Sequence, residues 1–486
     1  MESLNVPNSC HKLISRLDFS RVVKYTKQLG YNVTVHTDRK KVYSLILYSV
    51  SDMFFVLPSR IINKNIIQKR LEGIELENGE ACPGNKKLMK VIDIGQRLGT
   101  GTYGSVYSAL AKSKTKKGTE RPGYLSEFVL KLSAIKTSSY NNLKNGWKKS
   151  HPWKIPREAR ELMVHYLINP LLTENICPNF IFLYHWYLCN KCTHLQIKRE
   201  KRLISLDPKE CIISVLEKVD GGFNQMVLRR SKNWSAGKKD KIYRVAIFQV
   251  IMALAVLQKY YAIDHYDAGF RNIFFKEISR LDNSVTYWTY ILNGDTYHVP
   301  NPGYMFFLAD YGLAKSLRMF GQKQPSSMME TRLYNLIGKT EVDHFQRILE
   351  EEGDITYYPN PDIPYLATDD RTFDPYYNPE VFHIQDKGLL ILTKELEFYL
   401  KNGEIQDIQD YLNLVFVNET GKSAEELFNE KSDGPPVNYP EILEGLFGKW
   451  KNPPEEGICI GVYDADKPLP FNIDEYFLDI LKTKIY

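Results

Sequence analysis

The hydrophobic pattern of the chain changes near residue 91. Residues 1 to about 90 form a separate block, with a strand-like apolar run at 42–57 and a polar, glycine-containing close at 78–84 that is typical of a linker. From Val91 onward, short β-type runs surround glycines, then a helical stretch follows, and then two more β-type runs. This order predicts a small, mostly antiparallel β unit that carries one helix.

A helical pattern begins after Gly222. Apolar residues recur there at the spacing of one helix face, namely Ile242, Val245, Ala246, Val250, Leu254 and Leu257. No repeat with a period of 20 to 50 residues is visible, which argues against a solenoid. We therefore expect an α+β protein, with an N-terminal extension at 1–90, a β unit at 91–222, a helical unit at 223–430 and an acidic C-terminal region at 431–486 that could pack on the helical unit.

Composition is that of a globular protein, since 43% of the 486 residues are hydrophobic and 25% are charged. The net charge is +6, but residues 391–486 contain 19 acidic and 9 basic side chains, a net charge of −10, which leaves +16 on residues 1–390. Lysine-rich runs, such as 112–117, 198–202 and 229–241, could contact nucleic acid, anionic lipid or an acidic substrate, but solvated loops are the favoured interpretation.

Cysteine usage and the N-terminus indicate an intracellular protein. The seven cysteines are sparse and odd in number, unlike the dense framework of a small secreted domain, so we expect reduced thiols. The first residues lack a charged segment followed by an apolar core, and the run Tyr43–Leu57 is short and broken by Ser51 and Asp52. We predict no membrane span.

A glycine-rich stretch, Leu98-Gly99-Thr-Gly101-Thr-Tyr-Gly104-Ser-Val106, provides the first candidate chemistry. The Gly-x-Gly-x-x-Gly pattern alone is a weak signal, because ordinary turns and dinucleotide-binding folds also use it. Here a second strand follows it instead of a helix, so bound phosphates would lie under a hairpin, which disfavours a Rossmann domain. Glycines would let backbone amides approach the phosphates closely.

A lysine and a glutamate downstream form the second candidate. Lys131 ends the apolar run Phe128-Val-Leu and could hold phosphates as a point charge; Lys136, in Ser-Ala-Ile-Lys, is a rival. The helical segment after Pro156 offers two carboxylate partners about one turn apart, Glu158 and Glu161. Lys131 and Glu161 are the preferred pair.

Acidic and amide side chains supply the third candidate. His265-Tyr-Asp267-Ala-Gly-Phe-Arg-Asn272 follows the long helix, and Asp310-Tyr-Gly312 follows an apolar run. Asp267 could orient and accept the proton of a substrate hydroxyl, while Asn272 and Asp310 could hold a metal ion beside it.

These motifs, in this order over about 225 residues from Val91 to Lys315, resemble the eukaryotic-type protein kinase superfamily. The segments Asp310-Tyr-Gly-Leu-Ala and Glu161-Leu-Met-Val-His-Tyr are similar to the corresponding segments of the casein kinase 1 and vaccinia-related kinase group. The large insertions resemble those in kinases of large DNA viruses. The resemblance implies a small antiparallel β lobe with one helix and a larger helical lobe, with an extra N-terminal segment and insertions.

The resemblance also implies the activity and the site. It implies ATP and Mg²⁺, protein substrates, and transfer of the γ-phosphate of ATP to Ser/Thr hydroxyls. Asp267, Lys131 and Arg271 would be catalytic, and Asn272 and Asp310 would bind the metal. The strand running into Gly221-Gly222 would be the hinge, and the full implied ATP-binding set is Leu98, Gly99, Gly101, Gly104, Val106, Lys131, Glu161, Leu216, Glu217 and Val219.

Three features depart from the family pattern. Tyr266 replaces the arginine of His-Arg-Asp. Activation by a phosphate group that pairs with this arginine is therefore disfavoured, and constitutive activity is the favoured hypothesis. Gly269 stands where Ser/Thr kinases carry a lysine, and Arg271 could supply that charge. Asn272 and Asp310 are 38 residues apart, which is longer than the usual connection, and 281–304 is interpreted as an inserted hairpin.

Beyond Lys315 the resemblance weakens. Residues 376–381 resemble the Ala-Pro-Glu close of an activation segment, and Leu389, Leu392, Leu396 and Tyr399 have the spacing of a core helix.

Other interpretations stay open at this point: a kinase-like scaffold without activity, a phosphotransferase acting on a small molecule, or a kinase acting on Tyr. The pair Cys189-x-x-Cys192, with Cys177, His185, His194 and Cys211 nearby in the sequence, could form half of a zinc site, although ordinary reduced cysteines are favoured.

Overall fold

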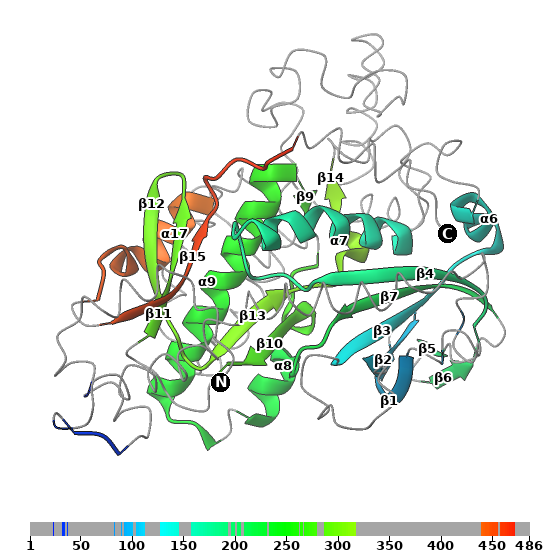
Figure 1. Ribbon diagram of the computed structural model, residues 1–486, viewed down its shortest axis with the longest axis horizontal. Coiled ribbons are helices and arrows are strands. Elements are labelled where there is room, and N and C mark those ends of the chain that lie inside the picture. Colours follow the sequence, from blue (N-terminus) through cyan, green and yellow to red (C-terminus); the bar gives the residue numbers. More distant parts are fainter. Residues whose placement is uncertain are drawn as a thin grey trace, which may run out of the picture.

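The computed structural model (Figure 1) describes most of the chain between residues 92 and 316 and a C-terminal part. The described ranges are 92–100, 104–111, 127–144, 157–192, 196–199, 202–205, 209–230, 233–261, 263–265, 267–278, 286–316, 439–454 and 457–471, with a few single positions before residue 92, among them Cys82. Several predictions lie outside the described residues: those for nearly all of 1–90, for Gly101 and Tyr266, and for the segments at 376–381 and 389–399.

A five-stranded antiparallel sheet forms the first part of the fold, with the strand order β1-β2-β3-β7-β4 (Figure 1). Its strands are β1 Ile92–Thr100, β2 Gly104–Ala111, β3 Glu127–Ala134, β4 Leu183–Cys192 and β7 Lys209–Glu217. A small hairpin joins β5 Gln196–Arg199 to β6 Arg202–Ser205. In β3, Phe128, Leu130 and Leu132 are buried on one face, so alternation places Lys131 on the opposite face.

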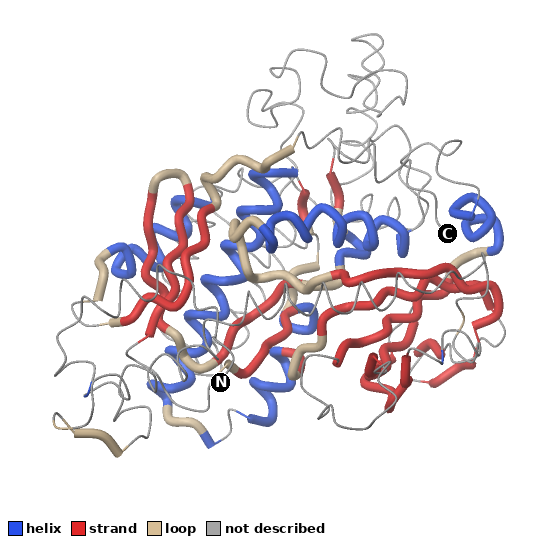
Figure 2. Tube along the Cα trace, in the orientation of Figure 1, coloured by secondary structure: helices blue, strands red, loops and turns tan. Residues whose placement is uncertain are grey.

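Two helices follow β3 in the chain, α6 Thr137–Lys144 and α7 Arg157–Thr173. Figure 2 shows α7 running alongside the strands β4 and β7. Its side chains from Leu162 to Leu172 are largely buried, so one long helix is packed into the core next to the sheet. The predicted β unit with a helix is therefore present, and α6 is an additional short helix.

The second part of the fold is built around α9 Ala236–Tyr261. Beside it lie a small sheet of β8 Gly221–Gly222, β10 Ile273–Glu277 and β13 Tyr304–Leu308, and a short pair of β9 Ile263–Asp264 with β14 Lys315–Ser316. A short helix, α8 Phe223–Gln225, and a π-helical turn, Met226–Arg230, lead from β8 toward α9.

The sequence predicts one apolar face on α9, but the structure buries this helix on all sides from Ile242 to Leu257. The reason is that other elements cover this helix on its remaining sides, as the contacts of Gln249 show. Gln249 accepts a hydrogen bond from the backbone N–H of Phe306 at 2.9 Å and donates one to the hydroxyl of Tyr290 at 3.1 Å.

The inserted hairpin predicted at 281–304 is confirmed. It consists of β11 Thr286–Leu292 and β12 Asp295–Pro300, which turn at Asn293 and Gly294 with φ values of 52° and 81°. Such left-handed turn residues match the twist of two-residue hairpins. The hairpin lies against the C-terminal part of the chain, not against the candidate catalytic residues.

The C-terminal part supplies α17 Tyr439–Phe447, a 3-10 turn Gly448–Lys451 and β15 Ile458–Asp464. Strand β15 pairs in parallel with β11, and Phe447 packs edge-on against Phe248 of α9. Asp466 accepts hydrogen bonds from the backbone N–H groups of Asn293 and Gly294, at 2.6 and 2.7 Å. The described segments after residue 438 thus pack on α9 and on the inserted hairpin.

The expectation of reduced thiols is wrong for two cysteines. Cys82 and Cys189, 107 residues apart in the sequence, form a disulfide. The separation explains why spacing could not predict the pair, because only the fold brings residue 82 next to the end of β4. None of the helices in the described ranges combines the length and apolar character that a bilayer crossing requires.

Candidate active site

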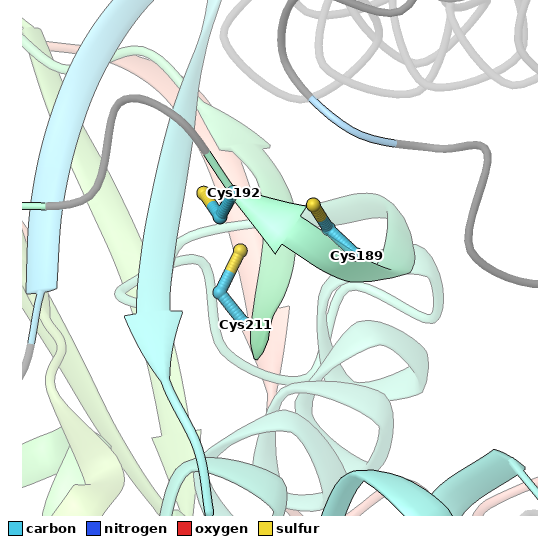
Figure 3. A group of neighbouring side chains, drawn as sticks. All are labelled: Cys189, Cys192 and Cys211. Atoms are coloured by element: carbon cyan, nitrogen blue, oxygen red, sulfur yellow. The ribbon is translucent and has the colours of Figure 1, made fainter. Parts of the chain in front are cut away.

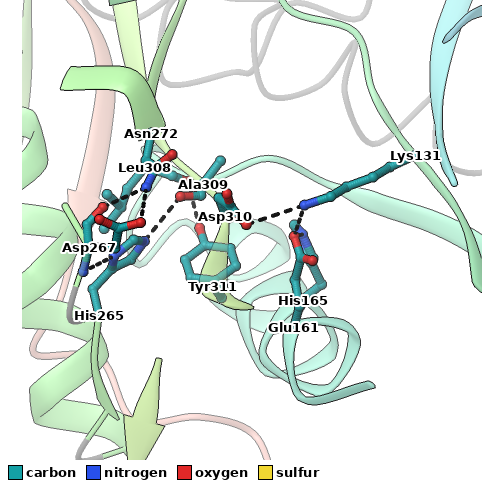
Figure 4. A network of polar contacts seen from close by, with 10 residues as sticks. All are labelled: Lys131, Glu161, His165, His265, Asp267, Asn272, Leu308, Ala309, Asp310 and Tyr311. Atoms are coloured by element: carbon teal, nitrogen blue, oxygen red, sulfur yellow. Dashed lines mark hydrogen bonds and ion pairs between the residues drawn. The ribbon is translucent and has the colours of Figure 1, made fainter. Parts of the chain in front are cut away.

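Lys131, Glu161 and Asp310 meet at the centre of the site (Figure 4). The Nζ atom of Lys131, on β3, lies 2.5 Å from Oε1 of Glu161, on α7, and 3.3 Å from Oδ1 of Asp310, which follows β13. Lys136 is exposed and comes after β3, and Glu161 is the helical glutamate that pairs with Lys131. The structure thus brings together the preferred pair and adds the carboxylate of Asp310.

The charge of Lys131 is held by these partners. Burial alone would lower the pKa of the ammonium group, but the carboxylates of Asp310 and Glu161 outweigh this effect and raise the pKa above its ordinary value. Lys131 therefore stays protonated at any physiological pH. Lys131 is a partly buried cation between two carboxylates, and the Asp310 side chain is 38% exposed, so the group is positioned to receive an anion.

His165 lies one helical turn after Glu161 and is buried beside it, with its Nε2 atom 4.0 Å from Oε1 of Glu161. Burial, together with the positive charge of Lys131, lowers the pKa of His165 to about 3. Its ring packs edge-on against Tyr311, with ring centroids 5.1 Å apart. His165 is therefore a neutral packing partner behind the ion pair.

Asp310 and Tyr311 form a tightly held turn. Asp310 has left-handed backbone angles, φ 64° and ψ 66°, which are uncommon for a residue other than glycine and are found at strained functional positions. The hydroxyl of Tyr311 donates to the carbonyl of Leu308 at 2.5 Å, which closes the turn. The Tyr311 ring lies between the rings of His165 and His265, which are 5.1 and 5.3 Å away.

Asp267, Arg271 and Asn272 form a second group (Figure 4 draws Asp267 and Asn272). Arg271 and Asn272 lie on a 3-10 turn, Phe270–Asn272, and Asp267 precedes it. Asn272 donates through Nδ2 to the backbone carbonyl of Asp267 at 2.7 Å and to Oδ2 of Asp267 at 2.9 Å. Arg271 pairs with Oδ1 of the same carboxylate. Asp267 and Asn272 are buried, while the Arg271 side chain is 61% exposed.

His265 joins the two groups. The backbone N–H of Asp267 donates to Nδ1 of His265 at 3.3 Å, so Nδ1 must be the acceptor nitrogen and Nε2 must carry the hydrogen. Nε2 then donates to the carbonyl of Ala309 at 3.1 Å. The N–H of Ala309 in turn donates to the carbonyl of Asn272 at 3.0 Å. These contacts fix the residue before Asp310 to the loop that carries Asp267.

The glycine-rich stretch forms a hairpin, with Gly99 opposite Val106 and Thr100 opposite Ser105. Gly104 is required by packing, because a Cβ atom there would lie 1.9 Å from the carbonyl oxygen of Leu132. A Cβ atom on Gly99 would meet nothing within 4 Å, so this position is open. Leu98 is 47% exposed and Val106 is partly buried.

The segment predicted as a hinge from the sequence comprises the end of β7 and the residues up to β8. Leu216 is buried opposite Val129 and Leu183, and Val219 packs partly buried against the core. The N–H of Glu217 donates to the carbonyl of Phe182 at 2.9 Å, so that this donor is engaged within the protein. The roles of Glu217 and Val219 toward a base stay a prediction.

Sequence reasoning missed two residues that support the site. Asn179 donates through Nδ2 to the carbonyl of Phe306 at 2.9 Å, and its own carbonyl accepts from the N–H of Leu308 at 2.9 Å, so it fixes the strand that leads to Asp310. His165 is the other. A polar residue four positions after Glu161, in an otherwise apolar helix stretch, is the signal that could have found His165.

Two curated proteins are similar to this chain, while no protein family model matches it. The first, "Probable serine/threonine-protein kinase 380R" of Invertebrate iridescent virus 6, is 24% identical over 256 residues, which are 52% of this chain and 42% of that protein. The second, "Putative serine/threonine-protein kinase 019R" of Frog virus 3 (isolate Goorha), is 21% identical over 223 residues, 46% of this chain and 23% of that protein.

The matched stretch spans less than half of each relative. At these identities the similarity supports a distant protein kinase relationship for about half of the chain. It does not extend to the substrates of either relative.

Proposed function

We propose that this chain is a protein kinase with the two-lobed fold, and that it transfers the γ-phosphoryl group of ATP to serine or threonine hydroxyls of proteins. The observation that carries the proposal is the contact of Lys131 with both Glu161 and Asp310. This arrangement, a strand lysine held by a helix glutamate next to an acidic residue, is the one that phosphoryl transfer by protein kinases requires. The names of the two viral relatives support the same activity.

In this proposal the five-stranded sheet with α7 is the small lobe, and the elements around α9 are the large lobe. The segment from Glu217 to Gly222 is the connection between them. Adenine would lie between the β1–β2 hairpin and this connection, close to Leu98, Val106 and Leu216. The open position at Gly99 leaves room for phosphates under the hairpin.

The donor set at Asn272 and Asp310 fits Mg²⁺. Both hydrogens of the Asn272 side-chain amide are directed at Asp267, so Oδ1 is the atom left to coordinate a cation. Asp310 contributes a partly exposed carboxylate. Hard oxygen ligands of this kind suit Mg²⁺, which when bound would neutralise the phosphate oxygens during transfer.

The remaining residues position the reactants. Lys131 would hold the α- and β-phosphates, because Glu161 fixes the direction of its ammonium group. Asp267 would orient the incoming hydroxyl and accept its proton, since its carboxylate is held by Asn272 and Arg271. Arg271, which is largely exposed, is the candidate cation for the γ-phosphate. The rate enhancement would come from positioning and from charge stabilisation.

The experiment uses the full chain with ATP labelled at the γ-phosphate and Mg²⁺. Mixed protein substrates are tested in parallel with aminoglycosides and lipid headgroup alcohols, and labelled protein is hydrolysed to identify the phosphoamino acid. The proposal expects label on phosphoserine and phosphothreonine. Label on small molecules in preference to protein would overturn the substrate class, and label on phosphotyrosine alone would overturn the Ser/Thr assignment.

A further inference from the structure

Four cysteines gather at the end of the five-stranded sheet that is remote from the hinge. The Sγ atoms of Cys189, Cys192 and Cys211 all lie within 4.8 Å of one another, and the three side chains are fully buried. Cys189 and Cys192 lie on β4 and Cys211 on the neighbouring β7, and Figure 3 shows the sulfur atom of Cys211 directed toward Cys192. The fourth sulfur, of Cys82, is bonded to that of Cys189.

The local strand geometry builds this cluster. Cys189 lies opposite Cys211 in the antiparallel pair of β4 and β7. In a regular strand Cys192, three positions after Cys189, would point to the other face of the sheet. The register of β4 against β7 is irregular between Cys189 and Cys192, and this irregularity lets both sulfur atoms approach Cys211.

The fourth member comes from a distant part of the chain. Cys82 is 7% exposed and precedes β1, so its sulfur reaches the cluster from outside the sheet. Cys82 therefore adds a fourth sulfur next to the three of the two paired strands, at the position of Cys189. Four cysteine sulfurs, two of them in a Cys-x-x-Cys pair, are the ligand set of a structural zinc site.

We propose that Cys82, Cys189, Cys192 and Cys211 together bind one zinc ion when all four are reduced. The ligands are soft thiolates, which prefer zinc to the hard cations Mg²⁺ and Ca²⁺. Since four protein ligands complete a tetrahedron, no position is left for water or substrate, so the ion is structural. It ties the segment around residue 82 to the end of the small sheet. This inference does not depend on the proposed kinase activity.

The disulfide and the zinc site are two states of the same four sulfurs. Reduction of the Cys82–Cys189 disulfide takes two electrons and two protons from a thiol reductant, which is itself oxidised to a disulfide. Binding of Zn²⁺ to the four thiols then releases four protons and leaves four thiolates on the metal. The zinc form is therefore the one expected in a thiol-reducing solution.

The first test measures metal in the full chain purified under reducing conditions without chelator. Elemental analysis should give about one zinc ion per chain, because four ligands serve one ion. Replacement of zinc by Co²⁺ should give the absorption bands of a tetrahedral sulfur-ligated ion. These two measurements need no variant, so they stand even where a cysteine substitution prevents folding.

The second test compares variants. Cys192→Ser and Cys211→Ser should lose the metal, whereas Cys459→Ser, at a partly exposed position on β15 away from the cluster, should keep it. Wild-type protein that stays free of zinc after incubation with a thiol and Zn²⁺, although a digest shows that the Cys82–Cys189 link has been reduced, would overturn the proposal. So would full zinc content in both cluster variants.

Discussion

His265 is linked to Ala309 by a hydrogen bond from its Nε2 atom to the Ala309 carbonyl, 3.1 Å away. Together with the hydrogen bond from the N–H of Ala309 to the Asn272 carbonyl, this contact connects the loop of Asp267 to the residue that precedes Asp310. Since Asp310 also contacts Lys131, the two groups of the candidate site are held by one continuous set of hydrogen bonds. Substitutions in either group should therefore affect phosphoryl transfer.

Replacement of Lys131 by Met should abolish most transfer. The substitution removes the cation that would hold the phosphates and leaves Glu161 and Asp310 without it, so the rate should fall by about 10²-fold or more. Lys136→Met is the matched control, because Lys136 is exposed and only five residues away. Equal loss in both variants, measured with labelled ATP, would contradict the role given to Lys131.

Replacement of Gly104 by Ala should destabilise the fold strongly. The added Cβ atom would lie 1.9 Å from the Leu132 carbonyl, so β2 and β3 must separate, at a cost of about 2 kcal/mol or more. In Gly99→Ala the added atom meets nothing within 4 Å, and the free energy of unfolding should change little. Urea titrations of the two variants compare them, and similar midpoints would count against the close approach of the strands.

Replacement of Tyr311 by Phe should lower stability moderately. The ring contacts with His165 and His265 would remain, but the hydrogen bond from the hydroxyl to the Leu308 carbonyl would be lost. The expected decrease in the free energy of unfolding is about 1 kcal/mol. Thermal and urea unfolding measure it, and an unchanged value would show that this hydrogen bond does not hold the turn at Asp310.

The buried His165 should make stability depend on pH. Its pKa is about 3 in the folded protein, against 6.5 for the ordinary side chain, so the unfolded state binds the extra proton between these values. Stability should therefore fall as pH drops below about 6.5, by up to about 1.4 kcal/mol per pH unit from this group.

His165→Phe keeps an aromatic ring against Tyr311 and removes this titration. Glu161, Asp310 and Lys131 surround the same position in both proteins, so the difference between wild type and variant isolates His165. Urea unfolding from pH 4 to pH 8 should show a steeper loss of stability in the wild type. If the free energy of unfolding depended on pH in the same way in both proteins, His165 would not be a buried neutral histidine.

Much of the candidate site could be predicted because its motifs are local. The spacing of Asp267 and Asn272, and the apolar run before Asp310, placed these residues without a structure. The local sequence alone could not show whether Lys131 or Lys136 forms the ion pair, because this depends on where α7 places the side chain of Glu161. Likewise, spacing offered Arg271 as a cation, but its pairing with Asp267 follows from the shape of the 3-10 turn.

Contacts between distant parts of the sequence are the features of the fold that could not be predicted. The Cys82–Cys189 disulfide and the pairing of β15 with β11 join segments more than a hundred residues apart, and no periodicity reports such a contact. The burial of α9 on all sides has the same origin, because it depends on neighbours such as Tyr290 and Phe306 that come from elsewhere in the chain.

The most direct measurement of the central proposal is transfer of labelled γ-phosphate to protein by wild type and by Asp267→Asn. The amide keeps the shape of the side chain but cannot accept the proton of the hydroxyl, so the rate should fall by about 10²-fold or more while the folded state persists. Transfer by the wild type with this loss in the variant is the predicted result. Absence of transfer by the wild type in Mg²⁺ and ATP, or equal rates in both proteins, would contradict the account.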